Sequence, residues 1–187
     1  VHAFEPLAEA YALLERNVRL NNMTNVKMHP VALGEQEGKA ELYINQESTL
    51  TSLGQTGRGN VVGVKKVPVW TLDAYASKIG LEKIDFLKID IEGFEGHVLR
   101  GANHLLKRSE GLVILCELAE KNYKPLNLSV NDVMNWMRAR DYAIWEIENK
   151  SGRLIRLEEN RSKYDNYNFV FVQCSSPKFA LIERLLK

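Results

Sequence analysis

Short apolar runs alternate with stretches of helical periodicity along this chain, and no other feature constrains its fold as strongly. Expected strands lie at 1–4, 26–33, 40–44, 61–70, 84–91, 112–116, 142–147, 153–157 and 168–173. Expected helices lie at 7–18, 71–80 and 94–108, after Ser129, and after Ser176 with Phe179, Ile182 and Leu186 on one stripe. Because strands that alternate with helices form right-handed crossovers, the sequence predicts an α/β fold with a mostly parallel sheet covered on both faces. The turn residues 149–152 add an antiparallel C-terminal edge.

Length and charge narrow the class of protein. The 187 residues fit a single domain over 1–187. The 25 Lys and Arg residues balance 24 Asp and Glu residues at a net charge of +1, so no nucleic-acid partner is expected. No apolar run approaches the ~18 residues of a membrane helix, and the first residues lack a signal-peptide pattern. We therefore expect a soluble, cytoplasmic protein in which Cys116 and Cys174 are buried free thiols.

Acidic residues follow three of the expected strands. Glu5 ends the first, Asp90 and Glu92 lie at the end of 84–91, and Glu117 follows 112–116. Any single acid at such a position can be a helix cap. Because ligands of open α/β sheets bind outside the carboxyl ends of the strands, three such ends are expected to converge on one site. An acid there can accept hydrogen bonds from both hydroxyls of a nucleoside ribose, a role that suits Glu5.

The segment 90–96, Asp-Ile-Glu-Gly-Phe-Glu-Gly, is the densest group of candidate functional residues. Its glycines allow a close approach of backbone to ligand, and its acids can orient a hydroxyl, take its proton or hold a divalent cation. Glu95 is explained more simply as a favourable charge in the first turn of a helix. The glycines of 54–59 lack the spacing of a phosphate loop, so the polar stretch 45–60 is expected to be a long loop.

Several segments together resemble the FkbM family of S-adenosylmethionine-dependent O-methyltransferases. They are Val1–Pro6 (VHAFEP), Asn17–Val26, Val31–Gly34 (VALG), Thr71–Asp73 (TLD), Asp85–Glu95 (DFLKIDIEGFE) and Val98–Gly101 (VLRG). The resemblance covers nearly the whole chain in order, and Lys-Ile-Asp-Ile-Glu-Gly followed by Val-Leu-x-Gly is its most specific part.

The resemblance implies a Rossmann-like class I methyltransferase sheet that binds S-adenosylmethionine. In that fold Glu5 would hold the ribose, the segment around Ala32 would line the adenine, and Asp90 would lie near the methionine end and the acceptor. The reaction would be methyl transfer to a hydroxyl, with Asp90, Glu92 and Glu117 as the acids that take a proton or hold a divalent cation.

One part of the family pattern is absent from this sequence. In sequence, the family's first strand and its glycine-rich turn would precede Val1. In the sheet, that strand would lie between the strand that ends at Glu5 and the strand that ends at Asp90. Without it, those two strands would stand about 9 to 10 Å apart, twice the usual spacing, with open hydrogen bonds on both flanks. Either these residues continue a longer polypeptide, or another chain supplies the strand, or cofactor binding has been lost.

Two functions of different class remain open. The first is an O-methyltransferase that acts on a hydroxyl of a small molecule or glycan. The second is a non-catalytic, methyltransferase-like module for binding or assembly. Methylation of nucleic acid is disfavoured by the charge balance. Acceptor specificity is expected from 45–60, 119–128 and the hairpin, and the last helix could pack on its own sheet or on a partner, including a second copy.

Overall fold

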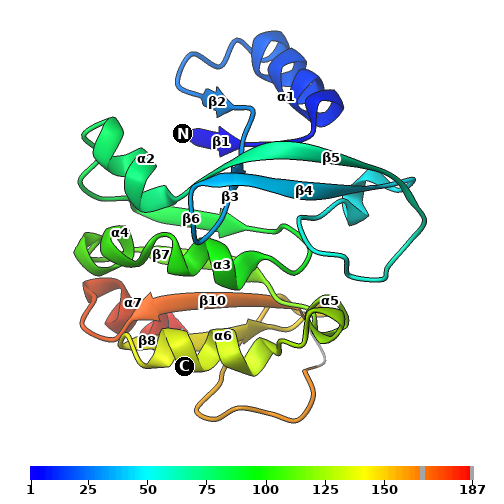
Figure 1. Cartoon of the computed structure of the whole chain (residues 1–187). Helices are drawn as coiled ribbons and strands as arrows, with labels where there is room; N and C mark the ends of the chain where they lie inside the picture. Colours follow the sequence, from blue (N-terminus) through cyan, green and yellow to red (C-terminus); the bar gives the residue numbers. More distant parts are fainter. Residues whose placement is uncertain (165–166, 186–187) are drawn as a thin grey trace.

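The computed structural model describes residues 1–164 and 167–185 and has the predicted α/β architecture (Figure 1). Its strands are β1 (His2–Phe4), β2 (Lys27–His29), β3 (Ala32–Leu33), β4 (Gly38–Asn45), β5 (Val61–Trp70), β6 (Phe86–Ile89), β7 (Val113–Glu117), β8 (Tyr142–Ile147), β9 (Leu154–Arg156) and β10 (Asn168–Gln173). Its helices are α1 (Ala8–Leu20), α2 (Leu72–Lys78), α3 (Glu95–Arg100), α4 (Asn103–Arg108), α5 (Glu120–Tyr123), α6 (Val130–Arg138) and α7 (Pro177–Leu185), with 3-10 turns η1 (Ser48–Leu50) and η2 (Lys124–Leu126).

The strands form three hydrogen-bonded groups, in the orders β1-β2, β3-β5-β4 and β6-β7-β10-β8-β9. Parallel pairs join β1 to β2, β3 to β5 and β6 to β7, whereas β4–β5, β7–β10, β10–β8 and β8–β9 are antiparallel. The prediction that the strands pair mostly in parallel was therefore wrong, since antiparallel strand pairs outnumber parallel ones among the described residues. The reason is that β10 inserts between β7 and β8, so the antiparallel part extends well beyond the predicted edge.

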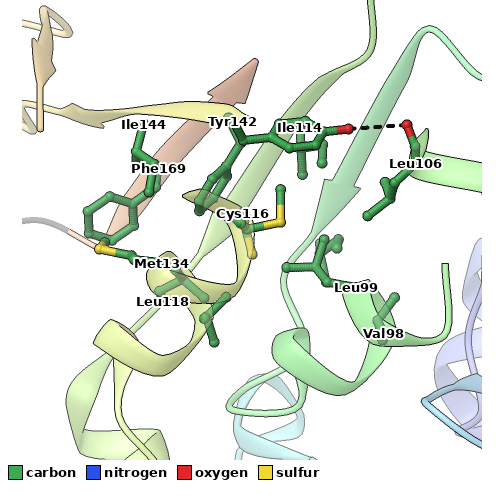
Figure 2. Packing of buried hydrophobic residues seen from close by; sticks show 14 of the residues in the cluster. Val98, Leu99, Leu106, Ile114, Cys116, Leu118, Met134, Tyr142, Ile144 and Phe169 are labelled. Atoms are coloured by element: carbon green, nitrogen blue, oxygen red, sulfur yellow. Dashed lines mark hydrogen bonds between the residues drawn. The ribbon is translucent and has the colours of Figure 1, made fainter. Parts of the chain in front are cut away.

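The main core lies on one face of the five-stranded sheet, beneath α2, α3, α4 and α6. Leu99, Leu106, Ile114 and Met134 are each at most 1% exposed there, and Figure 2 shows how these side chains meet around Cys116. A second cluster covers the opposite face, where Phe179 and Ile182 of α7 pack against the group that contains Trp145. Of the two alternatives left open for the stripe of the last helix, the structure shows packing on its own sheet for Phe179 and Ile182, while Leu186 lies outside the described residues.

The helices α2 and α6 begin at the capping residues that the sequence predicted. The Thr71 hydroxyl accepts a hydrogen bond from the Ala74 N–H at 3.1 Å and caps α2. Ser129 and Asp132 form a reciprocal capping box at the start of α6. Both motifs satisfy backbone N–H groups that a helix leaves without an internal partner, which is why they can be read from sequence.

Two predicted elements are divided in the structure. The expected strand 26–33 becomes β2 and β3, which belong to different sheets, because Pro30 has no N–H to continue the ladder. The expected helix 94–108 becomes α3 and α4, which are separated at Gly101. Cys116 is buried and Cys174 is exposed, so the expectation of burial was right for the first thiol and wrong for the second.

Gly101 marks a junction at which three motifs meet. A Cβ atom at Gly101 would lie 2.0 Å from the backbone oxygen of Gly34, so only glycine fits there. The Gly101 carbonyl accepts a hydrogen bond from the Asp73 N–H at 2.9 Å. The Asp73 carboxylate in turn accepts from the N–H groups of His104 and Leu105 at 2.9 and 2.7 Å and so begins α4. The segments VALG, TLD and VLRG therefore build one structural joint.

None of the helices in the described residues is both long and apolar enough to pass through a lipid bilayer.

Candidate functional site

A cavity of about 1250 Å³ lies between β1 and β6. Its lining includes the five residues to which the sequence assigned a role with cofactor or acceptor, namely Glu5, Ala32, Asp90, Glu92 and Glu117. The arrows of β1 and β6 point the same way in Figure 1, so Glu5 and Asp90 follow their strands at the same end of the cavity. Three strand ends thus do bring their acids to one place.

The two strands that flank the cavity each have one unpaired edge among the described residues. The N–H groups of Lys27 and Glu5 bond across the β1–β2 pair, to Val1 and His29 respectively. Since successive residues of a strand alternate in direction, the backbone groups of His2 and Phe4 point toward the cavity. The same alternation on β6, where Val113 donates to the Asp85 carbonyl, turns the backbone of Phe86 and Lys88 toward it.

Glu5 lies in the turn between β1 and α1. Its Oε1 accepts a hydrogen bond from the Leu7 N–H at 2.8 Å, which fixes the carboxylate at the cavity wall. Partial burial raises the pKa of Glu5, and the hydrogen bond from Leu7 opposes that shift. A carboxylate has lone pairs for about four hydrogen bonds, so Glu5 keeps acceptor capacity for a ligand. Ala32, only 4% exposed, contributes an apolar surface to the same cavity from β3.

The acids at the end of β6 have different partners. Asp90 is 41% exposed and pairs with Lys88 at 2.8 Å, so it faces solvent at the cavity mouth. Glu92 is 16% exposed and its Oε2 accepts hydrogen bonds from Arg58 and, at 2.9 Å, from the Asn122 amide. The charge of Glu92 is thus neutralised by a guanidinium, whereas Asp90 carries only an exposed ion pair, which is weak in water.

Glu117 ends β7 beside these two acids. Desolvation raises the pKa of Glu117, and the negative charges of Asp90 and Glu92 raise it further, while Lys88 and Lys121 act in the opposite direction. A carboxyl group with a raised pKa binds a proton closer to neutral pH than an ordinary glutamate does. Glu117 is therefore a candidate acid whose surroundings favour proton uptake, and two neighbouring carboxylates contribute to this.

Two segments that were predicted to carry acceptor specificity meet above these acids. Thr49, Thr51 and Leu53 of the loop 45–60 line the cavity. Arg58 of the same loop donates to the Asn122 side-chain oxygen at 2.7 Å and so joins the loop to the segment 119–128. The loop therefore forms part of the cavity wall, whereas its link to Asn122 through Arg58 had no motif to predict it.

A polar cluster along β1 and β2 was also missed, although His2 and Tyr75 line the same cavity. The Tyr75 hydroxyl lies 2.6 Å from His2 Nδ1 and 2.8 Å from His29 Nε2, while the Tyr75 ring stacks on Trp70 and meets Phe4 edge to face. Desolvation is the first cause that lowers the pKa of both histidines, and the positive charge of Lys27 adds to it. The three polar residues lie far apart in the sequence, so no local pattern could have grouped them.

A divalent cation was one expectation from the clustered acids. Within 1–164 and 167–185, no three His, Cys, Asp or Glu side chains come together as a set that could hold a metal ion. Three of the acids at the cavity, Glu5, Asp90 and Glu92, are instead engaged by Leu7, Lys88, Arg58 and Asn122 as described above.

Comparison with known proteins adds the family. A family model described as the methyltransferase FkbM domain matches residues 1–144, which include all the cavity acids. The chain belongs to this FkbM methyltransferase family. The sequence resemblance is therefore confirmed, and the FkbM domain model extends across β1 to the first part of β8.

Two relatives are similar to this chain over part of their own length. "Methyltransferase 1" of Beauveria bassiana (strain ARSEF 2860) is 27% identical in an alignment of 121 residues that covers 53% of this chain and 47% of that protein. The crystal structure of the methyltransferase FkbM from Methylobacillus flagellatus KT superposes with a TM-score of 0.54 at 16% identity, covering 91% of this chain and 36% of that one. The second comparison shows a shared fold, and this chain spans about half or less of both relatives.

Proposed function

We propose that this chain carries the cofactor and acceptor site of an S-adenosylmethionine-dependent methyltransferase that methylates a hydroxyl of a small molecule or glycan. The observation that carries the proposal is the convergence of Glu5, Asp90, Glu92 and Glu117 on one cavity in a member of the FkbM family. Acids at neighbouring strand ends suit a nucleoside cofactor on one side and a hydroxyl acceptor on the other.

The residues present fit the cofactor. Glu5 has free acceptor capacity for the ribose hydroxyls, Ala32 offers an apolar wall for the adenine, and Asp90 would lie near the methionine end. When bound, S-adenosylmethionine supplies an electrophilic methyl group on a positively charged sulfur. Acidic side chains around that end of the cavity favour a cation electrostatically.

Proton transfer is assigned among the three remaining acids by their surroundings. Glu117, whose pKa is raised by burial and by two neighbouring carboxylates, accepts the proton of the acceptor hydroxyl. Glu92, which is held by Arg58 and Asn122, orients that hydroxyl. Asp90, at the mouth of the cavity, would lie between the methionine end of the cofactor and the acceptor hydroxyl.

The acceptor is proposed to be uncharged. An anionic acceptor would have to approach the carboxylates of Asp90, Glu92 and Glu117, and Arg58 is already paired with Glu92. Thr49 and Thr51 provide neutral surface on the loop side of the same cavity. Hydroxyl groups of a small polyol or a glycan can donate hydrogen bonds to such carboxylates without this repulsion.

A strand upstream of Val1 is proposed to complete the sheet. The cavity exceeds the about 300 to 1,000 Å³ that is usual for a small-molecule pocket, so it has room for a peptide segment beside a cofactor. The outward backbone groups of β1 and β6 would pair with both sides of that strand. The aligned parts cover only 47% and 36% of these two relatives, so both are longer than this chain, which is compatible with such a segment.

The proposal is tested by calorimetric titration of S-adenosylmethionine and S-adenosylhomocysteine. The titration uses this chain, a version extended upstream, and the variants Glu5→Gln and Glu9→Gln of the extended version. Glu9 is the control because it lies on the surface and pairs with Lys65. Removing the charge of Glu5 is expected to raise Kd about tenfold to 100-fold, as for hydrogen bonds to a charged group, and Glu9→Gln to leave it unchanged.

The outcomes separate the two functions that the sequence left open. Binding that needs the upstream segment and weakens in Glu5→Gln supports the methyltransferase. Absence of binding by the extended protein would overturn it in favour of a non-catalytic, methyltransferase-shaped module, and the search would move to partner proteins.

A further inference from the structure

Glu95 is the most deeply buried carboxyl group near the cavity, yet it does not line it. It is the first residue of α3 and only 1% exposed. Its Oε1 accepts from the Ile91 N–H at 3.2 Å and from the Gly93 N–H at 3.0 Å, and its Oε2 accepts from the Tyr123 hydroxyl at 2.5 Å. A charge placed for the helix alone would remain in solvent, so the first-turn explanation of Glu95 was incomplete.

The turn that Glu95 binds has a costly backbone conformation. Glu92 has φ 58° and Gly93 has φ 107°, so two consecutive residues lie in the region that favours glycine. A non-glycine residue there costs of the order of 1 kcal/mol or more, and such a conformation persists only where its surroundings enforce it. The carboxylate of Glu95 contributes to those surroundings by accepting from the backbone N–H groups of Ile91 and Gly93.

The turn also packs directly against α5. A Cβ atom at Gly93 would lie 3.0 Å from the backbone oxygen of Asn122, so glycine permits this close approach. The adjacent residues Asn122 and Tyr123 reach back to Glu92 and Glu95 respectively. One short helix thereby holds one acid that faces the cavity and one acid that lies beneath it.

The hydrogen-bond pattern identifies the ionised form of Glu95 as the form that fits. The two amide groups and the Tyr123 hydroxyl all donate toward it, so an acceptor-only carboxylate satisfies each of them. Burial raises the pKa of Glu95, and these hydrogen bonds oppose the shift. An amide side chain of the same shape would instead direct an N–H group toward a donor, at the cost of an unsatisfied buried group.

We propose that Glu95 is a positioning residue, whose buried carboxylate holds the turn 91–93 so that Asp90 and Glu92 project into the cavity. Glu95 acts through these two acids and does not touch the ligand. The role of Glu95 in binding rests on the proposed function, whereas its role in shaping the turn does not.

The test compares Glu95→Gln with Tyr123→Phe and with Met137→Ala. Tyr123→Phe removes one hydrogen bond to Glu95 and leaves the amide contacts. Met137, which is fully buried in the core under α6, provides a control that lowers stability without altering the turn. Amide proton shifts and hydrogen exchange of residues 91 and 93 are measured by NMR in each variant, together with Kd for S-adenosylhomocysteine in the extended protein.

We expect Glu95→Gln to shift both amide signals and to remove their exchange protection, and to raise Kd about tenfold, which corresponds to one lost hydrogen bond to a charge. Tyr123→Phe should have a smaller effect, and Met137→Ala should change neither the two signals nor Kd. Unchanged amide signals in Glu95→Gln, or equal changes in Met137→Ala, would overturn the proposal. If the unsubstituted extended protein binds no cofactor, the methyltransferase proposal fails, and the NMR signals alone decide the role of Glu95.

Discussion

The strands on either side of the cavity belong to regions of very different packing. In β10, Phe169, Phe171 and Val172 are 0% exposed, and the strand is paired on both sides. In β1, all residues are only half-buried, and α1 has no buried residue at all. Stability in this chain is thus generated mainly by β7, β8, β10 and their helices, whereas β1 depends on β2 and the His2, His29 and Tyr75 cluster.

The difference bears on the site because the candidate residues are divided between the two regions. Asp90 and Glu117 end β6 and β7, which belong to the well-packed sheet, while Glu5 ends β1. Regions with few buried apolar contacts open locally at lower free energy than the core does. A ligand that contacts both Glu5 and Asp90 would therefore connect the region of β1, which opens locally at lower free energy, to the well-packed sheet that contains β6.

The largest effect on stability is expected when a phenylalanine of the well-packed region is truncated. Truncation of a phenylalanine in β1 provides the comparison. Phe171→Ala should lower the free energy of unfolding by about 4 kcal/mol, because it leaves a cavity in a fully buried core. Phe4→Ala should cost about 1 kcal/mol, because Phe4 is half-buried. Urea denaturation measures both values, and equal losses would remove the proposed difference between the two regions.

A slightly smaller effect is expected at the joint between the regions. Gly101→Ala should lower the free energy of unfolding by about 3 kcal/mol, since its Cβ would lie 2.0 Å from the Gly34 backbone oxygen. Gly63→Ala is the matched control, because a Cβ atom there meets nothing within 4 Å. Thermal unfolding of the two variants gives the comparison. A tolerated alanine at 101 would show that the two backbones can separate without cost.

A pH-dependent effect should be confined to the region around β1. The pKa of His2 and that of His29 are below their ordinary 6.5 in the folded protein, so the folded form favours neutral rings. Their contribution to stability is complete above about pH 6.5 and is lost as the pH falls below that value.

Hydrogen exchange, corrected for its intrinsic pH dependence, measures this loss. The amides of Glu5 and Lys27 should lose protection between about pH 7.5 and 5.5, and those of β10 should keep it. Tyr75→Phe removes the hydroxyl that joins the two rings and should lower the protection of Glu5 and Lys27 already at the higher pH. Uniform loss across both regions would contradict a local origin.

The smallest effect is expected on the surface of the well-packed region. Cys174→Ser should change the free energy of unfolding by at most about 0.5 kcal/mol, because Cys174 is exposed. A thiol reagent should modify Cys174 in the folded protein, although partial desolvation and the nearby Asp141 raise the pKa of the thiol and slow the reaction. Cys116 should react only after unfolding, and its rapid modification would show that the core opens more readily than proposed.

The sequence predicted elements well wherever the determining contact is local. The strand 61–70 and the caps at Thr71 and Ser129 were confirmed, because alternation and side-chain caps act within a few residues. The breaks at Pro30 and Gly101 were missed. The first depends on which sheet each half of the strand joins, and the second on the approach of Gly34 from another part of the chain.

The same limit applies to the candidate site, where contacts between distant parts of the sequence could not be predicted. Strand-end acids could be grouped because parallel strands end at one edge of a sheet, and all of them line the cavity. The partners of these acids could not be predicted. Arg58 lies 34 residues from Glu92, and Tyr123 lies 28 residues from Glu95, so neither pair leaves a spacing pattern.

The contact between Gly34 and Gly101 has an evolutionary consequence. Two backbones that touch without room for a methyl group cannot diverge independently. A homologue with a larger residue at 101 needs a turn after β3 that lies farther from α3. A homologue in which that turn is longer and lies elsewhere no longer requires glycine at 101. Among homologues of this chain, the identity of residue 101 and the length of the loop from 34 to 37 should therefore covary.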